Sequence, residues 1–168
     1  MSDSKDQSVW LKYTGEERAA VDDLARDYID FLSTCKTERE SVVEAVRRAE
    51  ACGYRDLGGL VARGEKLKAG DKVYAVNMKK AIVLFHIGTA PLEEGMNILG
   101  AHIDTCRLDV KQNPLYEDGG LAYFDTHYYG GIKKYQWVTI PLALHGVVVK
   151  KDGTVVEIVL GEKDGDPV

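Results

Sequence analysis

The sequence of 168 residues has few cysteines and no long apolar run, and both absences restrict what the protein can be. Its three cysteines, Cys35, Cys52 and Cys106, are an odd number, and their spacing matches neither a zinc ribbon nor a disulfide framework. No run of about 18 apolar residues occurs, and residues 1–13 contain no hydrophobic stretch typical of a signal peptide. We therefore expect a reduced, cytoplasmic protein that neither enters nor spans a membrane.

The composition and the missing motifs exclude further classes. The 27 Asp and Glu outnumber the 22 Lys and Arg, which gives a formal net charge of −5 and disfavours a nucleic-acid binder. The hydrophobic content of 45% excludes a disordered chain. The sequence contains no Gly-x-Ser-x-Gly elbow, no P-loop, no dinucleotide-binding fingerprint and no internal repeat. A globular chain of one domain, or of one domain and part of a second, remains.

The first half of the chain has the pattern of an α/β fold. Apolar residues at intervals of three and four predict one helix over 14–35 and a second over 37–52. Each begins with Thr and has Glu three residues later, which is the spacing of a capping box. Three runs rich in β-forming residues follow, at 72–78, 80–88 and 96–102. The last two are nearly continuously apolar, so we expect strands that are covered on both faces.

The second half has a different pattern. Its β-prone segments are residues 121–129, 135–150 and 154–160, and Lys151-Asp152-Gly153 predicts a hairpin turn. No helical periodicity of useful length remains. We therefore expect an α/β unit over residues 1–109 and an all-β unit over residues 110–168.

The segment most informative about function is 97–104, an apolar strand that ends in His-x-Asp. Carboxyl ends of strands in an α/β sheet face the ligand crevice. The alternation of a strand points His102 and Asp104 to the same side. Because a metal-bound imidazole usually donates its other N–H to a carboxylate, His102 is a candidate metal ligand and Asp104 a candidate to orient it. Taken alone, such a motif is more often a structural hydrogen-bonded pair or two surface polar residues than a metal site.

Several motifs over residues 100–149 occur together in an order known from one family. They are the His-x-Asp strand end, Arg107-Leu108-Asp109, Asn113-Pro114-Leu115-Tyr116-Glu117, His127-Tyr128-Tyr129-Gly130-Gly131 and Tyr135-Gln136-Trp137. This stretch resembles the M18 metallopeptidases, the aspartyl-aminopeptidase and vacuolar aminopeptidase I family, and it is most similar to their bacterial branch. The two helices and the strands up to Gly88 also follow the order of the family.

The resemblance implies a zinc-dependent aminopeptidase that acts on peptides with a free N-terminus. It implies two zinc ions, with His102 as a ligand of one of them and Asp104 as the residue that orients His102. His127 would help to complete a substrate site, either its own or a neighbouring subunit's; a packed histidine in a β unit is the alternative. The implied fold is the N-terminal part of an α/β/α catalytic domain followed by part of an inserted all-β dimerisation domain. The implied assembly is a homo-oligomer, a dodecamer in full-length members.

The rest of the family's machinery lies later in its sequence, namely a bridging aspartate, two glutamates, a further aspartate and a second histidine. A zinc site normally needs three or four protein ligands, and no second cluster accompanies His102. We therefore expect the sequence to be the N-terminal portion of an enzyme, inactive by itself. The alternative is a short non-catalytic relative that acts as an oligomerisation or interaction module. Coding sequence that continues past Val168 would favour the first reading.

The remaining candidate residues have less specific patterns. Relatives commonly have Ser-Pro where this sequence has Thr105-Cys106, and we expect Cys106 to be a free thiol and not a metal ligand. His86 and His145 are expected to be core or edge histidines. Four carboxylates are too irregularly spaced to predict the paired acids of a glycosidase: Asp109, Glu117, Asp118 and Asp125.

Overall fold

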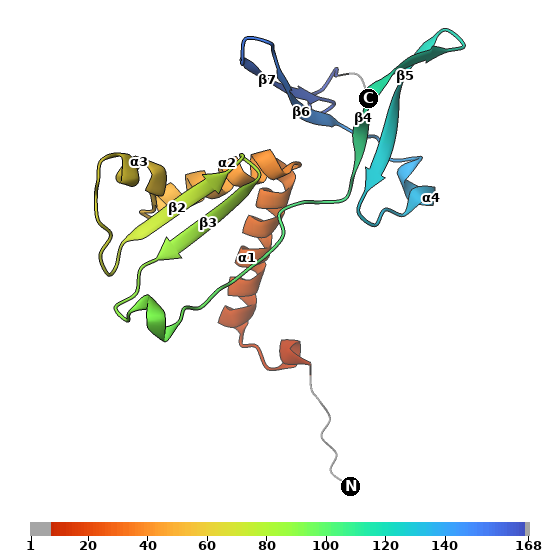
Figure 1. Ribbon diagram of the computed structural model, residues 1–168. Coiled ribbons are helices and arrows are strands. Elements are labelled where there is room, and N and C mark those ends of the chain that lie inside the picture. Colours follow the sequence, from red (N-terminus) through yellow and green to blue (C-terminus); the bar gives the residue numbers. More distant parts are fainter. Residues whose placement is uncertain (1–7, 167–168) are drawn as a thin grey trace. The chain divides into compact units, whose positions relative to one another are not determined.

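The computed structural model describes residues 8–166, and the chain divides into two units on either side of the Cys35–Lys36 bond. The first unit contains a short 3-10 helix, η1 (Val9–Leu11), and the long helix α1 (Gly15–Thr34) (Figure 1). The predicted capping box is present, since the Thr14 hydroxyl accepts from the Glu17 N–H at 3.2 Å and the Glu17 carboxylate accepts from the Thr14 N–H at 2.8 Å.

Helix α2 (Glu38–Ala51) opens the second unit and also has the predicted capping box. The Thr37 hydroxyl accepts from the Glu40 N–H at 3.3 Å, and Glu40 accepts from the Thr37 N–H at 2.9 Å. The helix ends at Ala51, and Gly53 follows its C-cap with a φ of 84°, a left-handed conformation that favours glycine. Both helices are therefore predicted from their local sequence.

A three-stranded sheet packs against α2 (Figure 1). Its order is β1 (Arg55–Asp56), β2 (Lys72–Asn77) and β3 (Ala81–His86), with β1 parallel and β3 antiparallel to β2. The short helix α3 (Leu57–Ala62) connects β1 to β2 and contacts both. The core of this unit is formed by Val42 and Ala49 of α2, Leu60 of α3, and Val73 and Tyr74 of β2. Burial of a Leu or Val side chain contributes roughly 1.5–3 kcal/mol, so these residues hold the layer together.

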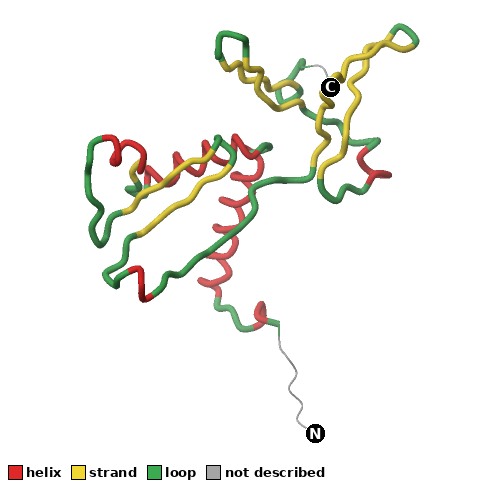
Figure 2. The backbone as a smooth tube through the Cα atoms, in the orientation of Figure 1, coloured by secondary structure: helices red, strands yellow, loops and turns green. Residues whose placement is uncertain are grey.

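Two β-hairpins follow, and both appear as paired strands in Figure 2. The first consists of β4 (Arg107–Asp118) and β5 (Leu121–Tyr129), and the second of β6 (Leu144–Val149) and β7 (Val155–Leu160). The second turn is the predicted one, where the Asp152 carboxylate accepts from the Thr154 N–H at 2.9 Å. The order of an α/β region followed by hairpins confirms the fold class that the sequence predicts.

The expectation of a buried strand over 96–102 is wrong. The segment is in no strand, and Ile98 and Leu99 are 79% and 100% exposed. Strand β3, expected to be covered on both faces, is also largely exposed. The reason is the same in both cases. Within residues 8–166, β3 has β2 on one edge only, and no strand pairs with 96–102.

Two short helices are not predicted from the sequence. Residues 135–150 are expected to be β-prone, but α4 (Lys134–Trp137) occupies their start and regular pairing begins only at Leu144. Helix α3 lies in a Gly-rich stretch, where the Asp56 carboxylate caps it by accepting from two backbone N–H groups. Helices of one or two turns are too short to show a hydrophobic period. No helix in the described part of the chain is long and apolar enough to cross a membrane.

Candidate metal centre

His102 and Asp104 lie in the loop that leads into β4, and the structure brings them together. The His102 Nδ1 lies 2.9 Å from the Asp104 carbonyl oxygen and 3.1 Å from its Oδ1. Both neighbours are acceptors, so the neutral form of the imidazole that fits these contacts has its proton on Nδ1 and its lone pair on Nε2. The His102 side chain is 84% exposed, which leaves Nε2 accessible. This is the arrangement that a metal-ligating histidine requires.

The Asp104 carboxylate is held from its other side by Tyr129, the last residue of β5. The Tyr129 hydroxyl donates to Oδ2 at 2.7 Å. This hydrogen bond is the largest influence that lowers the pKa of Asp104, and it raises the pKa of the Tyr129 hydroxyl. Asp104 is therefore ionised at neutral pH and can act as the acceptor for His102.

The Tyr129 ring is held in turn by Arg107. The guanidinium carbon lies 4.0 Å from the ring centroid, within the range of a cation–π contact. The same guanidinium donates to Asp109 at 2.7 Å and to Glu38 of α2 at 2.9 Å. Burial lowers the pKa of Arg107 but the two carboxylates outweigh it, so the pKa is raised and the charge is permanent. A continuous set of contacts thus runs from the N-terminus of α2 to His102.

The predicted substrate residue His127 lies near this set but not in it. In the β4–β5 pairing, His127 is opposite Asp109 and Tyr129 is opposite Arg107. Because every second residue of a strand points to the same side, these four residues share one face of the hairpin. The His127 ring stacks on Tyr128 with centroids 5.0 Å apart. Within residues 8–166 no hydrogen bond or ion pair joins His127 to His102, and its role in substrate binding stays a prediction.

His102 is suited to provide one ligand to a zinc ion. In the described residues no group of three or more His, Cys, Asp or Glu side chains is arranged to hold a metal ion. The exposed Nε2, backed by a carboxylate, is the chemistry of a single zinc-ligating imidazole. Cys106 is exposed, forms no disulfide, and directs its thiol to the Gly131 carbonyl at 3.5 Å.

The remaining carboxylates do not converge. Asp109 binds Arg107, Asp125 pairs with Lys111 at 2.9 Å, and Glu117 accepts from the Gly120 N–H at 2.7 Å. These are local contacts within the β4–β5 hairpin.

The contacts of His145 are a further feature that the sequence does not predict. It is expected to be a core or edge histidine, and its side chain is only 11% exposed. Its Nδ1 lies 2.8 Å from Glu40 of α2, and its Nε2 lies 2.9 Å from Glu162 after β7. The imidazole therefore joins the second hairpin to the capping residue of α2.

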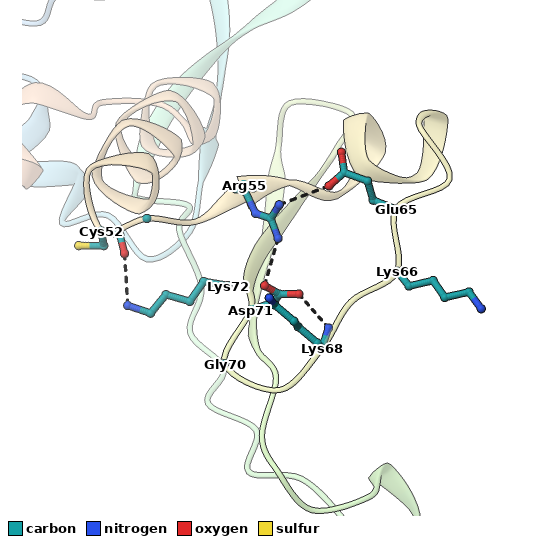
Figure 3. A pocket seen from close by; sticks show the side chains of 9 residues that line it. Cys52, Arg55, Glu65, Lys66, Lys68, Gly70, Asp71 and Lys72 are labelled. Atoms are coloured by element: carbon teal, nitrogen blue, oxygen red, sulfur yellow. Dashed lines mark hydrogen bonds and ion pairs between the residues drawn. The ribbon is translucent and has the colours of Figure 1, made fainter.

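A separate surface pocket of about 640 Å³ lies at the C-terminal end of α2 (Figure 3). Arg55 extends between Glu65 and Asp71, at 3.4 and 3.1 Å, and Lys72 donates to the Cys52 carbonyl at 3.2 Å. The pocket contains none of the candidate residues. Its ion pairs connect β1 to the loop before β2.

Comparison with known proteins identifies the family of this chain. The family model for the aminopeptidase I zinc metalloproteases (M18) matches residues 31–168. The probable M18 family aminopeptidase 1 of Clostridium acetobutylicum is 57% identical over 162 residues, covering 96% of this chain and 35% of the relative. The corresponding Thermotoga maritima protein is 45% identical over 166 residues, covering 96% of this chain and 34% of its own length.

Solved structures lead to the same family. Aminopeptidase I from Borrelia burgdorferi matches with a TM-score of 0.86 at 38% identity, over 96% of this chain and 39% of that one. Aminopeptidase I from Clostridium acetobutylicum matches with a TM-score of 0.80 at 56% identity, over 96% and 35%. These similarities define a metallopeptidase fold. The chain belongs to the M18 family, as its motifs predict, and it spans about a third of the length of the curated relatives it matches.

Proposed function

We propose that the protein acts as a zinc-dependent aminopeptidase that removes N-terminal amino acids from peptides. Membership of the M18 family supports the reaction class. The observation that carries the proposal is the His102–Asp104 contact, which fixes the Nδ1–H tautomer and leaves Nε2 accessible to a metal. The matching relatives are named as aminopeptidases, which favours the enzyme over a non-catalytic interaction module.

In this proposal each residue has a defined task. His102 provides a neutral nitrogen ligand through Nε2. Asp104 accepts a hydrogen bond from the Nδ1–H, which orients the ring and makes the imidazole a stronger donor to a metal. Zinc, when bound, supplies a Lewis acid that activates a water and polarises the scissile carbonyl. His127 is proposed to contact the substrate from the exposed face of the first hairpin.

The proposal includes a site of two zinc ions, whose other ligands lie outside the described residues. It also divides the chain into part of a catalytic domain, residues 1–109, and part of an inserted β domain, residues 110–168. The change from mixed helices and strands to hairpins supports this division. We further propose a cytoplasmic homo-oligomer. A yeast protein of the same fold, at 21% identity, has been solved as a dodecamer.

A chimera tests the proposal. This chain would replace the corresponding third of the Clostridium acetobutylicum relative, to which it is 57% identical. We expect the purified chimera to retain zinc and to release amino acids from aminoacyl reporter substrates, with the parent relative as the positive control. The His102→Ala chimera should lose zinc and turnover together. A folded chimera that keeps full turnover without His102 would refute the proposal.

A further inference from the structure

The contact between His102 and Asp104 needs support from outside the pair. The two side chains are 84% and 34% exposed, and exposed ion pairs contribute only about 0–1 kcal/mol because solvent screens them and both side chains lose freedom. The Nδ1–Oδ1 distance of 3.1 Å is also at the long end for a hydrogen bond. A carboxylate in this setting would turn easily toward water.

We infer that Tyr129 is a positioning residue for the proposed metal site, whose hydroxyl fixes the Asp104 carboxylate in the orientation that accepts the His102 Nδ1–H. The Tyr129–Asp104 hydrogen bond of 2.7 Å is shorter than the His102–Asp104 contact, and it occupies the opposite oxygen. With Oδ2 held by Tyr129, Oδ1 is directed at His102. Only the assignment of a metal to Nε2 rests on the proposed function.

The Tyr129 hydroxyl can act this way because its ring is itself fixed. Tyr129 lies opposite Arg107 in the β4–β5 ladder, and the guanidinium covers the ring at 4.0 Å. Arg107 is anchored by Asp109 on its own strand and by Glu38 on α2. A tyrosine has only two side-chain torsions to fix, so a ring held in this way presents its hydroxyl at a defined point.

The size of the effect follows from what remains when the hydroxyl is removed. In Tyr129→Phe the ring and its contact with Arg107 persist, and His102 can still donate to the Asp104 carbonyl at 2.9 Å. The tautomer preference should therefore weaken and not disappear. Groups that support a metal ligand typically change metal affinity by about 10–100-fold. Because Tyr129 acts through Asp104, we expect a weakening of about 3–10-fold in Zn²⁺ affinity.

Tyr128→Phe is a matched control. It removes the same hydroxyl from the adjacent residue of β5, whose ring contacts Lys134 at 4.2 Å and stacks on His127. Within residues 8–166 its hydroxyl makes no hydrogen bond to Asp104. A general disturbance of the hairpin would appear in both variants. Loss of the Asp104 orientation would appear in Tyr129→Phe alone.

The experiment is histidine-selective ¹⁵N NMR of the 168-residue chain at pH 8, first without metal and then during Zn²⁺ titration. We expect the wild type and Tyr128→Phe to show His102 mainly as the Nδ1–H tautomer, and Tyr129→Phe to shift it toward Nε2–H. An unchanged His102 tautomer in a folded Tyr129→Phe variant, judged from its backbone amide spectrum, would overturn the inference. If Tyr129→Phe does not fold, Arg107→Lys decides, because it keeps the charge beside Glu38 and loses the planar cover of the ring. It should shift the tautomer in the same direction, and no shift would count against the inference.

The two claims fail in different ways. The tautomer shift without metal tests the positioning role of Tyr129. The zinc content of the His102→Ala chimera tests the proposed function. A tautomer shift in Tyr129→Phe together with a His102→Ala chimera that keeps its zinc would support the positioning role and contradict the metal site. If the wild type, Tyr128→Phe and Tyr129→Phe bind Zn²⁺ at His102 with equal affinity and have the same His102 tautomer, the metal site would be supported and the positioning role contradicted.

Discussion

Replacing His145 by glutamine should destabilise the protein in a pH-dependent manner. His145 contacts Glu40 at 2.8 Å and Glu162 at 2.9 Å, with its side chain 11% exposed. Burial lowers the pKa of this imidazole, but its hydrogen bonds to the two carboxylates outweigh burial and raise the pKa above 6.5. Glutamine keeps a similar size and polar character but cannot carry the positive charge.

The magnitude follows from the number and exposure of the contacts. A hydrogen bond to a charged group contributes about 1.5–3 kcal/mol when well shielded. Glu40 and Glu162 are 31% and 42% exposed, so solvent screening reduces this value. Glu40 also keeps its bonds to the Lys36 and Thr37 backbone N–H groups when His145 is replaced. We expect a loss of about 1–2 kcal/mol in the free energy of unfolding.

The sign of the pH dependence follows from both partners. A raised pKa for His145 gives stability that is fully present below pH 6.5 and is lost as pH rises through the folded-state value. Burial raises the pKa of Glu40, but hydrogen bonds, first that of His145, lower it below 4.5 overall. Its contribution is present above pH 4.5 and lost as pH falls through its folded-state value. The contacts should therefore contribute most between about pH 5 and 6.

Urea unfolding followed by far-UV circular dichroism at pH 3, 5.5 and 9 measures this effect. The difference between wild type and His145→Gln should be largest at pH 5.5 and should fall toward zero at pH 9. His86→Gln, on exposed strand β3, is the control and should change stability little at any pH. A His145→Gln difference that is constant from pH 5.5 to 9 would refute the assignment of a charged imidazole between two carboxylates.

Three further predictions concern the metal, the α2 cap and the hairpin edge. Calorimetric titration of the isolated chain with Zn²⁺ should show weak, non-stoichiometric binding, because the described residues provide no group of three ligands; one tight site that His102→Ala abolishes would contradict this. Thr37→Ala should lower the free energy of unfolding, measured in urea, by about 1 kcal/mol, because it removes the acceptor for the Glu40 N–H. A change below about 0.5 kcal/mol, the usual range for a surface substitution, would count against the cap. Light scattering at tens of micromolar should show self-association, because within residues 8–166 no third strand pairs with the edges of the β6–β7 sheet, and Val156→Lys on β7 should reduce it. A strict wild-type monomer would refute this edge argument.

Features set by neighbouring residues in the chain could be predicted from the sequence. Both capping boxes and the turn at 151–153 depend on residues three or fewer positions apart, and the structure contains all three. The prediction of a strand over 96–102 was wrong. Its apolar residues indicate that the segment tends to be buried, but they do not specify which other strand would bury it. Burial of Leu99 would require a neighbouring strand, and no described strand pairs with its segment.

The candidate site shows the same limit. The structure brings His102 and Asp104 together as expected, but not through the alternation of a strand, because the segment is in no strand. Tyr129 is 25 positions from Asp104, and no local pattern can predict a hydrogen bond over that distance. The contact of His145 with Glu40 spans 105 positions. A sequence signal for Tyr129 did exist, since it lies in the same motif as His127, but only the ladder register reveals which residue of that motif meets Asp104.

The most direct test of the central claim is anomalous diffraction at the zinc edge from crystals of the active chimera. The account predicts a zinc peak at about 2.0–2.1 Å from the His102 Nε2, with the Nδ1 still bound to Asp104. The peak should be missing from this position in the His102→Ala chimera. An active chimera whose zinc lies away from His102 would contradict the account.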